Sequence, residues 1–198
     1  MKLRLLLPLL VLLSCTALES PRDRARKAVE RRVEAGVVVE LEGGERLVVE
    51  RVEVLAMDAY RDERGGLEGF AQLAIEGKVG EIPISYLGNE RIAFRCGSSS
   101  CSVDGPLARR LEGVAAALSA RRRALAREDG PALSALDAEG RPFAHDEVRT
   151  AAARPVSAWY VRVESGSAIV GEADPEGRQR RLRLVEREGG WRFEAGLP

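Results

Sequence analysis

The sequence is poor in aromatic residues and contains a single histidine, and these shortages limit its chemistry. Aromatic residues make up 5% of the 198 residues, so a core has to rely on Val, Leu, Ile and Ala. The formal net charge at neutral pH is zero, and only three of the basic residues are lysines. A chain with this balance lacks the basic footprint of a nucleic-acid-binding protein. We therefore expect no nucleic acid among its partners.

Catalytic and metal-binding motifs are lacking as well. The one histidine, His145, lies in the polar segment 143–147, and we interpret it as a solvated loop residue rather than a general base. No Gly-x-Ser-x-Gly motif is present to expose a serine nucleophile at a strand-to-helix turn. We expect no metal and no cofactor, and the sequence identifies no catalytic residue.

The first fourteen residues have the layout of a secretory signal peptide. Lys2 and Arg4 form a short basic region, and Leu5 to Leu13 form an apolar run interrupted only by Pro8. This run is about half of the ~20 residues that a membrane-spanning helix needs. The pattern therefore favours a cleaved leader over a retained transmembrane anchor.

The end of the leader, Leu12-Leu-Ser-Cys15, resembles the lipobox of bacterial lipoproteins, although Leu13 is bulkier than the residue usual there. The resemblance implies cleavage after Ser14 and acylation of Cys15, with several acyl chains that give stable membrane attachment. Thr16 rather than Asp follows the cysteine, which favours the outer membrane, facing the periplasm. The alternative is an ordinary signal peptide cleaved nearby, which leaves Cys15 as an unmodified thiol.

The two other cysteines, Cys96 and Cys101, flank a Gly-Ser-Ser-Ser segment. In an exported chain this even pair predicts a local disulfide. Free thiols, a redox-active pair and a metal site remain as alternatives, but the spacing is not Cys-x-x-Cys and His145 alone could supply an imidazole.

Residue patterning predicts an α+β protein of two small domains, each with helix first and antiparallel sheet after it. Residues 1–14 are the signal peptide, 15–20 a lipid-anchored tether, 21–105 the first domain and 106–198 the second. In the first domain, Ser20-Pro21 starts a helix that ends at Gly36. Alternating apolar residues then predict strands over 37–41, 46–58, 70–79, 82–86 and 91–95, with a turn at Gly88-Asn89.

The second domain begins with a long helix from Leu107, followed by a short helix after Asp129-Gly-Pro131 and another over 146–153. Two hairpins follow, over 157–172 and 180–195. Arg121, Arg122 and Arg123 fall near the end of the long helix, where cations oppose the negative end of the dipole. The arginine-rich strand 178–183 is either a surface for an acidic partner or a charge-protected edge.

This second half resembles the NTF2-like superfamily, the SnoaL and ketosteroid-isomerase type of α+β cone. The resemblance rests on the long helix, on Arg127-Glu-Asp-Gly-Pro-Ala-Leu133, and on the closing Arg187-Glu-Gly-Gly-Trp191-Arg-Phe193. It implies a curved sheet around a conical pocket, without deciding whether the protein is an enzyme. Residues that could reach such a pocket are Asp137, His145, Asp146, Trp159 and Tyr160, and none matches a catalytic motif of the family.

We expect a non-catalytic envelope lipoprotein that is anchored to the membrane by its N-terminal lipid and binds an unknown protein or small-molecule ligand. The alternative is a periplasmic NTF2-like enzyme, of isomerase or hydrolase type, acting on a small apolar substrate. A peptidoglycan-associated or assembly factor is a third hypothesis, although no sugar-binding or repeat signature supports it. A buried carboxylate with a raised pKa inside the cone would favour the enzyme, and a cone filled by Leu and Trp would favour the binding module.

Overall fold

The computed structural model describes residues 19–61 and 67–194, so the leader and Cys15 lie outside the described residues. No helix in the described part is long and apolar enough to cross a membrane. Its helices are α1 (Pro21–Glu34), α2 (Arg109–Ala126), α3 (Gly130–Leu136) and α4 (His145–Ala152). Its strands are β1 (Val37–Glu40), β2 (Arg46–Arg61), β3 (Leu67–Val79), β4 (Ile82–Cys96), β5 (Cys101–Asp104), β6 (Ala158–Glu164), β7 (Ser167–Ala173), β8 (Gln179–Arg187) and β9 (Gly190–Glu194).

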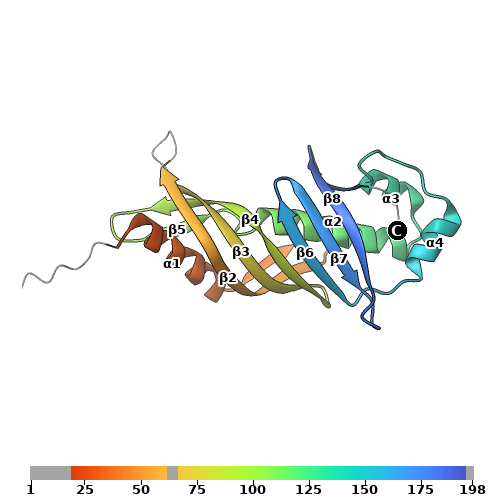
Figure 1. Cartoon of the computed structure of the whole chain (residues 1–198), viewed down its shortest axis with the longest axis horizontal. Helices are drawn as coiled ribbons and strands as arrows, with labels where there is room; N and C mark the ends of the chain where they lie inside the picture. The colour runs from red at the N-terminus through yellow and green to blue at the C-terminus, as the bar shows by residue number, and fades with distance from the viewer. Residues whose placement is uncertain (1–18, 62–66, 195–198) are drawn as a thin grey trace, which may run out of the picture.

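The strands form one nine-stranded sheet in the order β1-β2-β3-β4-β6-β7-β8-β9, with β5 paired to β4. The α+β class is thus confirmed. All neighbours are antiparallel except β4 and β6, which pair in parallel from Ile84↔Trp159 to Gly88↔Val163. This one ladder joins the two halves of the sequence. Helix α2 runs along the sheet, with α1 toward one end of the molecule and α3 and α4 toward the other (Figure 1).

The core lies between the sheet and α2. Leu111, Val114 and Leu118 recur at helical spacing on one face of α2 and are fully buried. They belong to one apolar cluster that also contains inward-facing residues of both halves of the sheet, including Leu73 and Trp159. Burial of each large apolar side chain contributes about 1.5–3 kcal/mol, so the shared core stabilises both halves together.

Helix α2 lacks a side-chain cap of its own and begins instead on a carboxylate from the sheet. Its N-cap is Ala108, and the buried Glu90 of β4 accepts hydrogen bonds from the backbone N–H groups of Arg110 (3.1 Å) and Leu111 (3.3 Å). These are donors that a helix start otherwise leaves unsatisfied. Tyr86, also on β4, donates its hydroxyl to the same carboxylate and orients it. Glu90 thereby fixes the start of α2 against β4.

The predicted turn at Gly88-Asn89 is wrong, because β4 continues through both residues. Gly88 pairs with Leu73 on one side and Val163 on the other. A Cβ atom there would lie 2.4 Å from the Tyr86 hydroxyl oxygen and 3.1 Å from the Val163 Cβ. The glycine therefore serves close packing inside the sheet rather than a change of chain direction.

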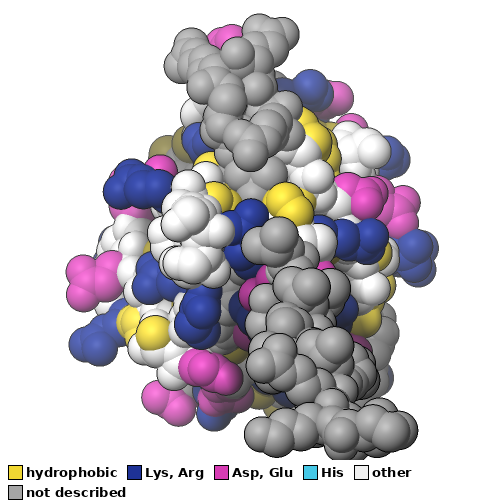
Figure 2. Space-filling view, turned by 90° about the vertical axis from the view of Figure 1, so that its left-hand side faces the viewer, with side chains coloured by type: hydrophobic (Ala, Val, Ile, Leu, Met, Phe, Trp, Pro, Cys, Tyr) yellow, Lys and Arg dark blue, Asp and Glu magenta, His cyan; other side chains and the backbone are white. Residues whose placement is uncertain are grey.

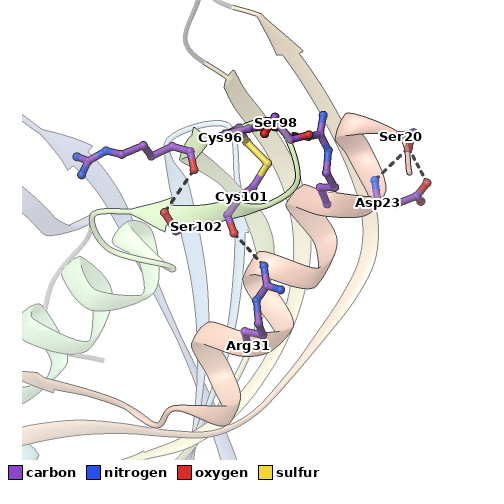
Figure 3. The surroundings of a disulfide bond; sticks show 10 residues. Ser20, Asp23, Arg31, Cys96, Ser98, Cys101 and Ser102 are labelled. Carbon is purple, nitrogen blue, oxygen red and sulfur yellow. Dashed lines mark hydrogen bonds between the residues drawn. A yellow bond between two sulfur atoms is a disulfide. The ribbon is translucent and has the colours of Figure 1, made fainter. Parts of the chain in front are cut away.

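The predicted Cys96–Cys101 disulfide is confirmed, and it closes the tight connection between β4 and β5. Helix α1 packs beside it (Figure 3). Arg24 donates to the carbonyl oxygens of Gly97 (3.1 Å) and Ser98 (2.7 Å), and Arg31 donates to that of Cys101 (2.9 Å). Two cations of α1 thus hold the disulfide loop through its backbone.

The predicted start of α1 is confirmed as well. The Ser20 hydroxyl oxygen accepts a hydrogen bond from the backbone N–H of Asp23 at 3.1 Å, and Pro21 occupies the first helical position. The Ser20 hydroxyl in turn donates to the Asp23 carboxylate at 2.6 Å (Figure 3). The helix therefore has a fixed entry close to the expected tether.

Candidate functional site

The residues predicted to reach a pocket in the second half are spread over several surroundings. Trp159 and Tyr160 are neighbours on β6 and point to opposite faces, so Trp159 is buried in the core and Tyr160 is 48% exposed. His145 and Asp146 begin α4 at the surface, and the His145 imidazole lies 3.8 Å from the Glu128 carboxylate. Only Trp159 among these four residues contacts the polar cluster described below.

Asp137, the fifth predicted pocket residue, is buried at the end of α3. Its carboxylate accepts hydrogen bonds from the backbone N–H of Glu139 (2.9 Å) and from the Arg141 guanidinium (3.1 Å). Burial alone would raise the pKa of Asp137, but these hydrogen bonds and the charge of Arg141 outweigh it and lower the pKa. Asp137 therefore serves as an ionised anchor for the loop after α3.

The described part of the second half contains a buried ionic cluster that the sequence did not predict. Arg121 of α2 donates to both carboxylate oxygens of Glu172 on β7, at 3.2 and 3.3 Å. Trp159 donates its indole N–H to the same carboxylate at 3.0 Å, and Arg180 of β8 also pairs with it. Arg121 and Glu172 are 3% exposed. Glu172 is thus the common acceptor for donors from three different elements.

Each charged member of this cluster stands at a position where the periodicity of its helix or strand otherwise places a buried apolar residue. Arg121 falls between Leu118 and Leu125 on the apolar stripe of α2. On β7, Glu172 follows the buried Ala168 and Val170 at two-residue spacing, and on β8 Arg180 precedes the buried Leu182 and Leu184 in the same way. The regular geometry of the helix and strands therefore points all three side chains into the molecule.

The structure corrects one sequence interpretation and bears on a second. The dipole of α2 does not account for Arg121, because its side chain is buried against β7 rather than placed at the solvated helix end. Strand β8 lies between β7 and β9, but β9 pairs only with residues 183–187. Residues 179–182 pair with β7 on one side and with no described strand on the other, so this stretch has the position of the charge-protected edge. Its residue Arg180 turns inward, whereas Arg181 is exposed on the opposite face.

The cluster has more donors than acceptors. The Nη2 atom of Arg121 and the Nη1 atom of Arg180 are buried and have no hydrogen-bond partner among the described residues. Two guanidinium charges face one carboxylate, so the cluster carries one net positive charge. Arg121 also lies over the Phe193 ring, 5.6 Å from its centroid, and the Arg180 side chain is 18% exposed. Burial lowers the pKa of Arg121; Glu172 opposes this effect and the nearby Arg180 adds to it. Buried polar groups without partners are rare, and each implies an unsatisfied interaction.

Two adjoining cavities border the cluster. One, of about 210 Å³, lies between α2, the end of α4 and the segment before β6, and is lined by Arg121, Glu172 and Arg180. The other, of about 300 Å³, lies over the β7–β8 turn and shares Glu172 and Arg180 with the first. Together their linings carry five arginines and two carboxylates. Arg122 and Arg178 have acidic partners of their own, so the excess of positive charge lies with Arg121 and Arg180, which share Glu172. This excess makes the region suited to an anionic group.

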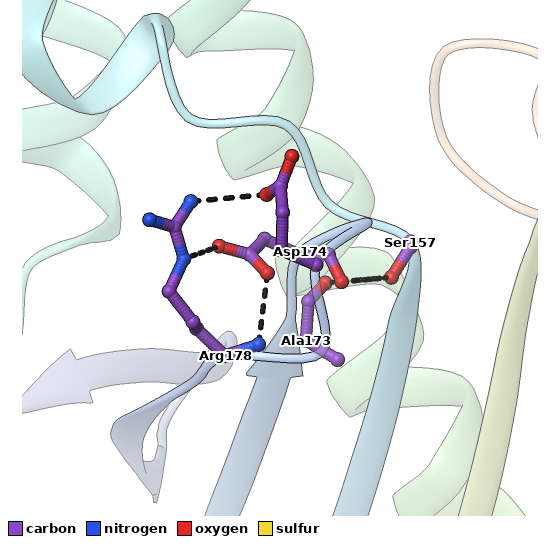
Figure 4. Close-up of polar contacts among 5 residues, drawn as sticks. Ser157, Ala173, Asp174 and Arg178 are labelled. Atoms are coloured by element: carbon purple, nitrogen blue, oxygen red, sulfur yellow. Dashed lines mark hydrogen bonds and ion pairs between the residues drawn. The ribbon is translucent and has the colours of Figure 1, made fainter.

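The β7–β8 turn forms a braced rim for the second cavity. Arg178 donates to the Asp174 carboxylate at 2.6 Å and to Glu176 at 3.0 Å, which accounts for its charge (Figure 4). Ser157, just before β6, donates its hydroxyl to the carbonyl oxygens of Ala173 and Asp174. The segment before β6 and the rim are therefore held together beside the cavity.

A third cavity, of about 500 Å³, lies near the start of α2 but has a balanced lining of three arginines and four acidic residues. Its buried acid is Glu90, whose pKa is raised by burial and moderated by hydrogen bonds from Tyr86, Arg110 and Leu111. Because these donors belong to the sheet and to the start of α2, Glu90 acts as a helix cap. We therefore take the arginine-lined cavities as the candidate site.

The described side chains visible at the α1 end carry charges of both signs. Figure 2 shows basic and acidic side chains interspersed there with small apolar patches. In the parts of the chain that the structure describes, no group of three or more His, Cys, Asp or Glu residues is arranged to hold a metal ion.

Comparisons with known proteins do not add an identification. The chain matches no protein-family model, no curated protein and no solved structure. The function therefore has to be argued from the site itself.

Proposed function

We propose that the protein is a non-catalytic binding module of the bacterial cell envelope, and that its ligand enters the arginine-lined cavities beside β7 and β8. The observation that carries this proposal is the buried cluster of Arg121, Glu172 and Arg180. Two of its guanidinium nitrogens have no partner among the described residues, and all three residues line a cavity. A cluster that served only to hold the fold would gain from pairing every donor. Ligand pockets combine an apolar lining with a few convergent polar groups, and this cavity has both.

The envelope location is proposed from the leader and its lipobox resemblance, with Cys15 as the acylated residue. The Cys96–Cys101 disulfide fits an oxidising compartment such as the periplasm. Helix α1 lies toward one end of the molecule, and α4, whose end borders the cavity, lies toward the other (Figure 1). A tether just before α1 would therefore present the cavity away from the membrane.

For the second half, residues 106–198, we propose an NTF2-like cone that shares its sheet and core with residues 21–105. Helices followed by the antiparallel meander β6 to β9 support this proposal. The side of this meander that faces α2 is filled by Leu118, Trp159 and Trp191, all buried. A filled cone leaves little room for a substrate at its centre, so we favour the binding module over the periplasmic enzyme.

Fractionation of the producing bacterium tests the tethered binding function. We expect the wild-type protein and the control variant Thr16→Ala to stay in the washed membrane pellet and to incorporate labelled palmitate. The variant Cys15→Ala should lose the label and leave the pellet. Native mass spectrometry of the gently extracted wild type should then show a bound small molecule. Unlabelled protein, or protein that carries no ligand from its host, would count against the proposal.

A further inference from the structure

We propose that the cavity beside Arg121 and Arg180 binds the carboxylate of a small aliphatic monoanion. This inference rests on the proposed binding function and names the chemical class of its ligand.

The charge balance calls for one negative charge. Arg121 and Arg180 share the single carboxylate of Glu172 inside the protein. Of the other cations nearby, Arg122 pairs with Glu45 and Arg178 pairs with Asp174. Arg154 lies at the exposed side of the cavity and is not without a partner. A monoanion would therefore neutralise the cluster, whereas a dianion would leave a buried negative charge in excess. A buried charge of either sign that lacks a counter-charge destabilises the protein.

The hydrogen-bonding pattern also fits a carboxylate. The free donors are one terminal nitrogen on each of two guanidinium groups, Nη2 of Arg121 and Nη1 of Arg180. A carboxylate offers two oxygens with acceptor capacity and no donor, and arginine pairs with it in strong charge-assisted hydrogen bonds. A neutral amide offers only one such oxygen and adds donors that the cluster does not need.

Apart from Arg122 and Arg154, the remaining wall of the cavity is apolar. Leu125 and Ala126 of α2, Ala151 and Ala152 of α4, and the segment Pro155–Val156 line it, together with Ile82. Arg154 and Pro155 are exposed and form its outer side. A ligand with a charged end and a short hydrocarbon chain would contact both parts of this lining. The volume of about 210 Å³ restricts that chain to a short one.

Calorimetric titration of the mature, detergent-extracted protein tests the inference. The probes are hexanoate, the matched neutral hexanamide and inorganic phosphate, all at constant ionic strength. We expect hexanoate to bind measurably more tightly than the other two. The variant Arg180→Gln should weaken hexanoate binding by about tenfold or more, because a charge-assisted hydrogen bond is lost. The control Arg181→Gln makes the same change on the exposed face of β8 and should stay within about twofold of wild type.

Thermal unfolding keeps the test decisive if Arg180→Gln does not fold. A ligand that binds only the native state raises its unfolding temperature, so hexanoate should stabilise the wild type more than hexanamide does. Equal effects of the acid and the amide would overturn the inference, as would equal losses in the Arg180 and Arg181 variants. Tighter binding of phosphate would overturn the carboxylate assignment.

Different results would refute the carboxylate inference and the proposed binding function. If the protein extracted from its host carries a neutral small molecule and does not bind hexanoate, the carboxylate inference is wrong and the binding function stands. If it carries nothing and binds none of the probes, both are wrong.

Discussion

Replacement of Glu172 by Gln should lower the free energy of unfolding by about 3–5 kcal/mol, the usual cost of removing one partner from a buried ion pair. The carboxylate accepts from Arg121 at 3.2 and 3.3 Å, from Trp159 at 3.0 Å and from Arg180. A glutamine keeps the shape but has a single acceptor oxygen, and it leaves two guanidinium charges with no buried counter-charge. The loss is large beside the ~5–15 kcal/mol that typically stabilises a domain.

Urea unfolding followed by circular dichroism, with wild type and variant compared at neutral pH, measures this loss. The matched control is Glu164→Gln, because Glu164 pairs with Arg162 on β6 and both side chains are about two-thirds exposed. An exposed pair of this kind contributes about 1 kcal/mol or less. In the double variant Glu172→Gln with Arg180→Gln, removal of one unpaired cation should restore part of the stability. A loss at Glu172 no larger than that at Glu164 would refute the reasoning.

Three further changes test other parts of the fold. Gly88→Ala should cost about 1–3 kcal/mol in urea unfolding, because the new Cβ would lie 2.4 Å from the Tyr86 hydroxyl oxygen; a neutral effect would contradict the packing described for β4. Burial raises the pKa of Glu90 in the folded protein above its value in the unfolded chain. The folded state therefore holds the proton more tightly, and its free energy of unfolding should fall as the pH rises above ~4.5. The variant Glu90→Gln lacks this titration, so wild type should lose stability relative to it over that range. A pH series of unfolding midpoints measures this trend, and a difference that is flat or grows in favour of wild type would contradict it. Replacement of Cys96 and Cys101 by Ser should cost about 2 kcal/mol, as expected for so short a loop, and reductant should produce the same loss in wild type only.

Local features of the fold could be predicted from the sequence because their signals are local. The alternation of Ala71, Leu73 and Ile75 predicted the buried face of β3, and Ser20-Pro21 predicted the start of α1. Those patterns depend on steric and hydrogen-bonding rules that act over a few residues. The two cysteines likewise needed only their separation and an exported context.

The parallel pairing of β4 with β6 could not be predicted in the same way. The partners Ile84 and Trp159 are separated by three helices, and no local pattern encodes that contact. Gly88 misled the prediction because a glycine followed by asparagine is typical of turns. Its role became visible only with Tyr86 and Val163 packed against it.

The candidate site was missed for a different reason. From the sequence alone, Arg121 is assigned to the helix dipole and Arg180 to an exposed charged strand, and Glu172 is given no role. Each of the three nevertheless stands where the pattern of its helix or strand places a buried side chain. A charged residue in a core position needs a buried partner, and three such residues on separate elements are able to supply one another. That signal was present in the sequence, but only the fold shows that the three side chains meet.

The most direct test of the account is the mass of the protein extracted gently from its host membranes, measured first under native and then under denaturing conditions. We expect the denatured chain to start at an acylated Cys15 with Cys96 and Cys101 oxidised. The native spectrum should contain an additional small molecule, lost in a variant with Arg180→Gln and retained with Arg181→Gln. A chain that keeps Met1, or that carries neither lipid nor ligand, would contradict the proposal of a tethered binding module.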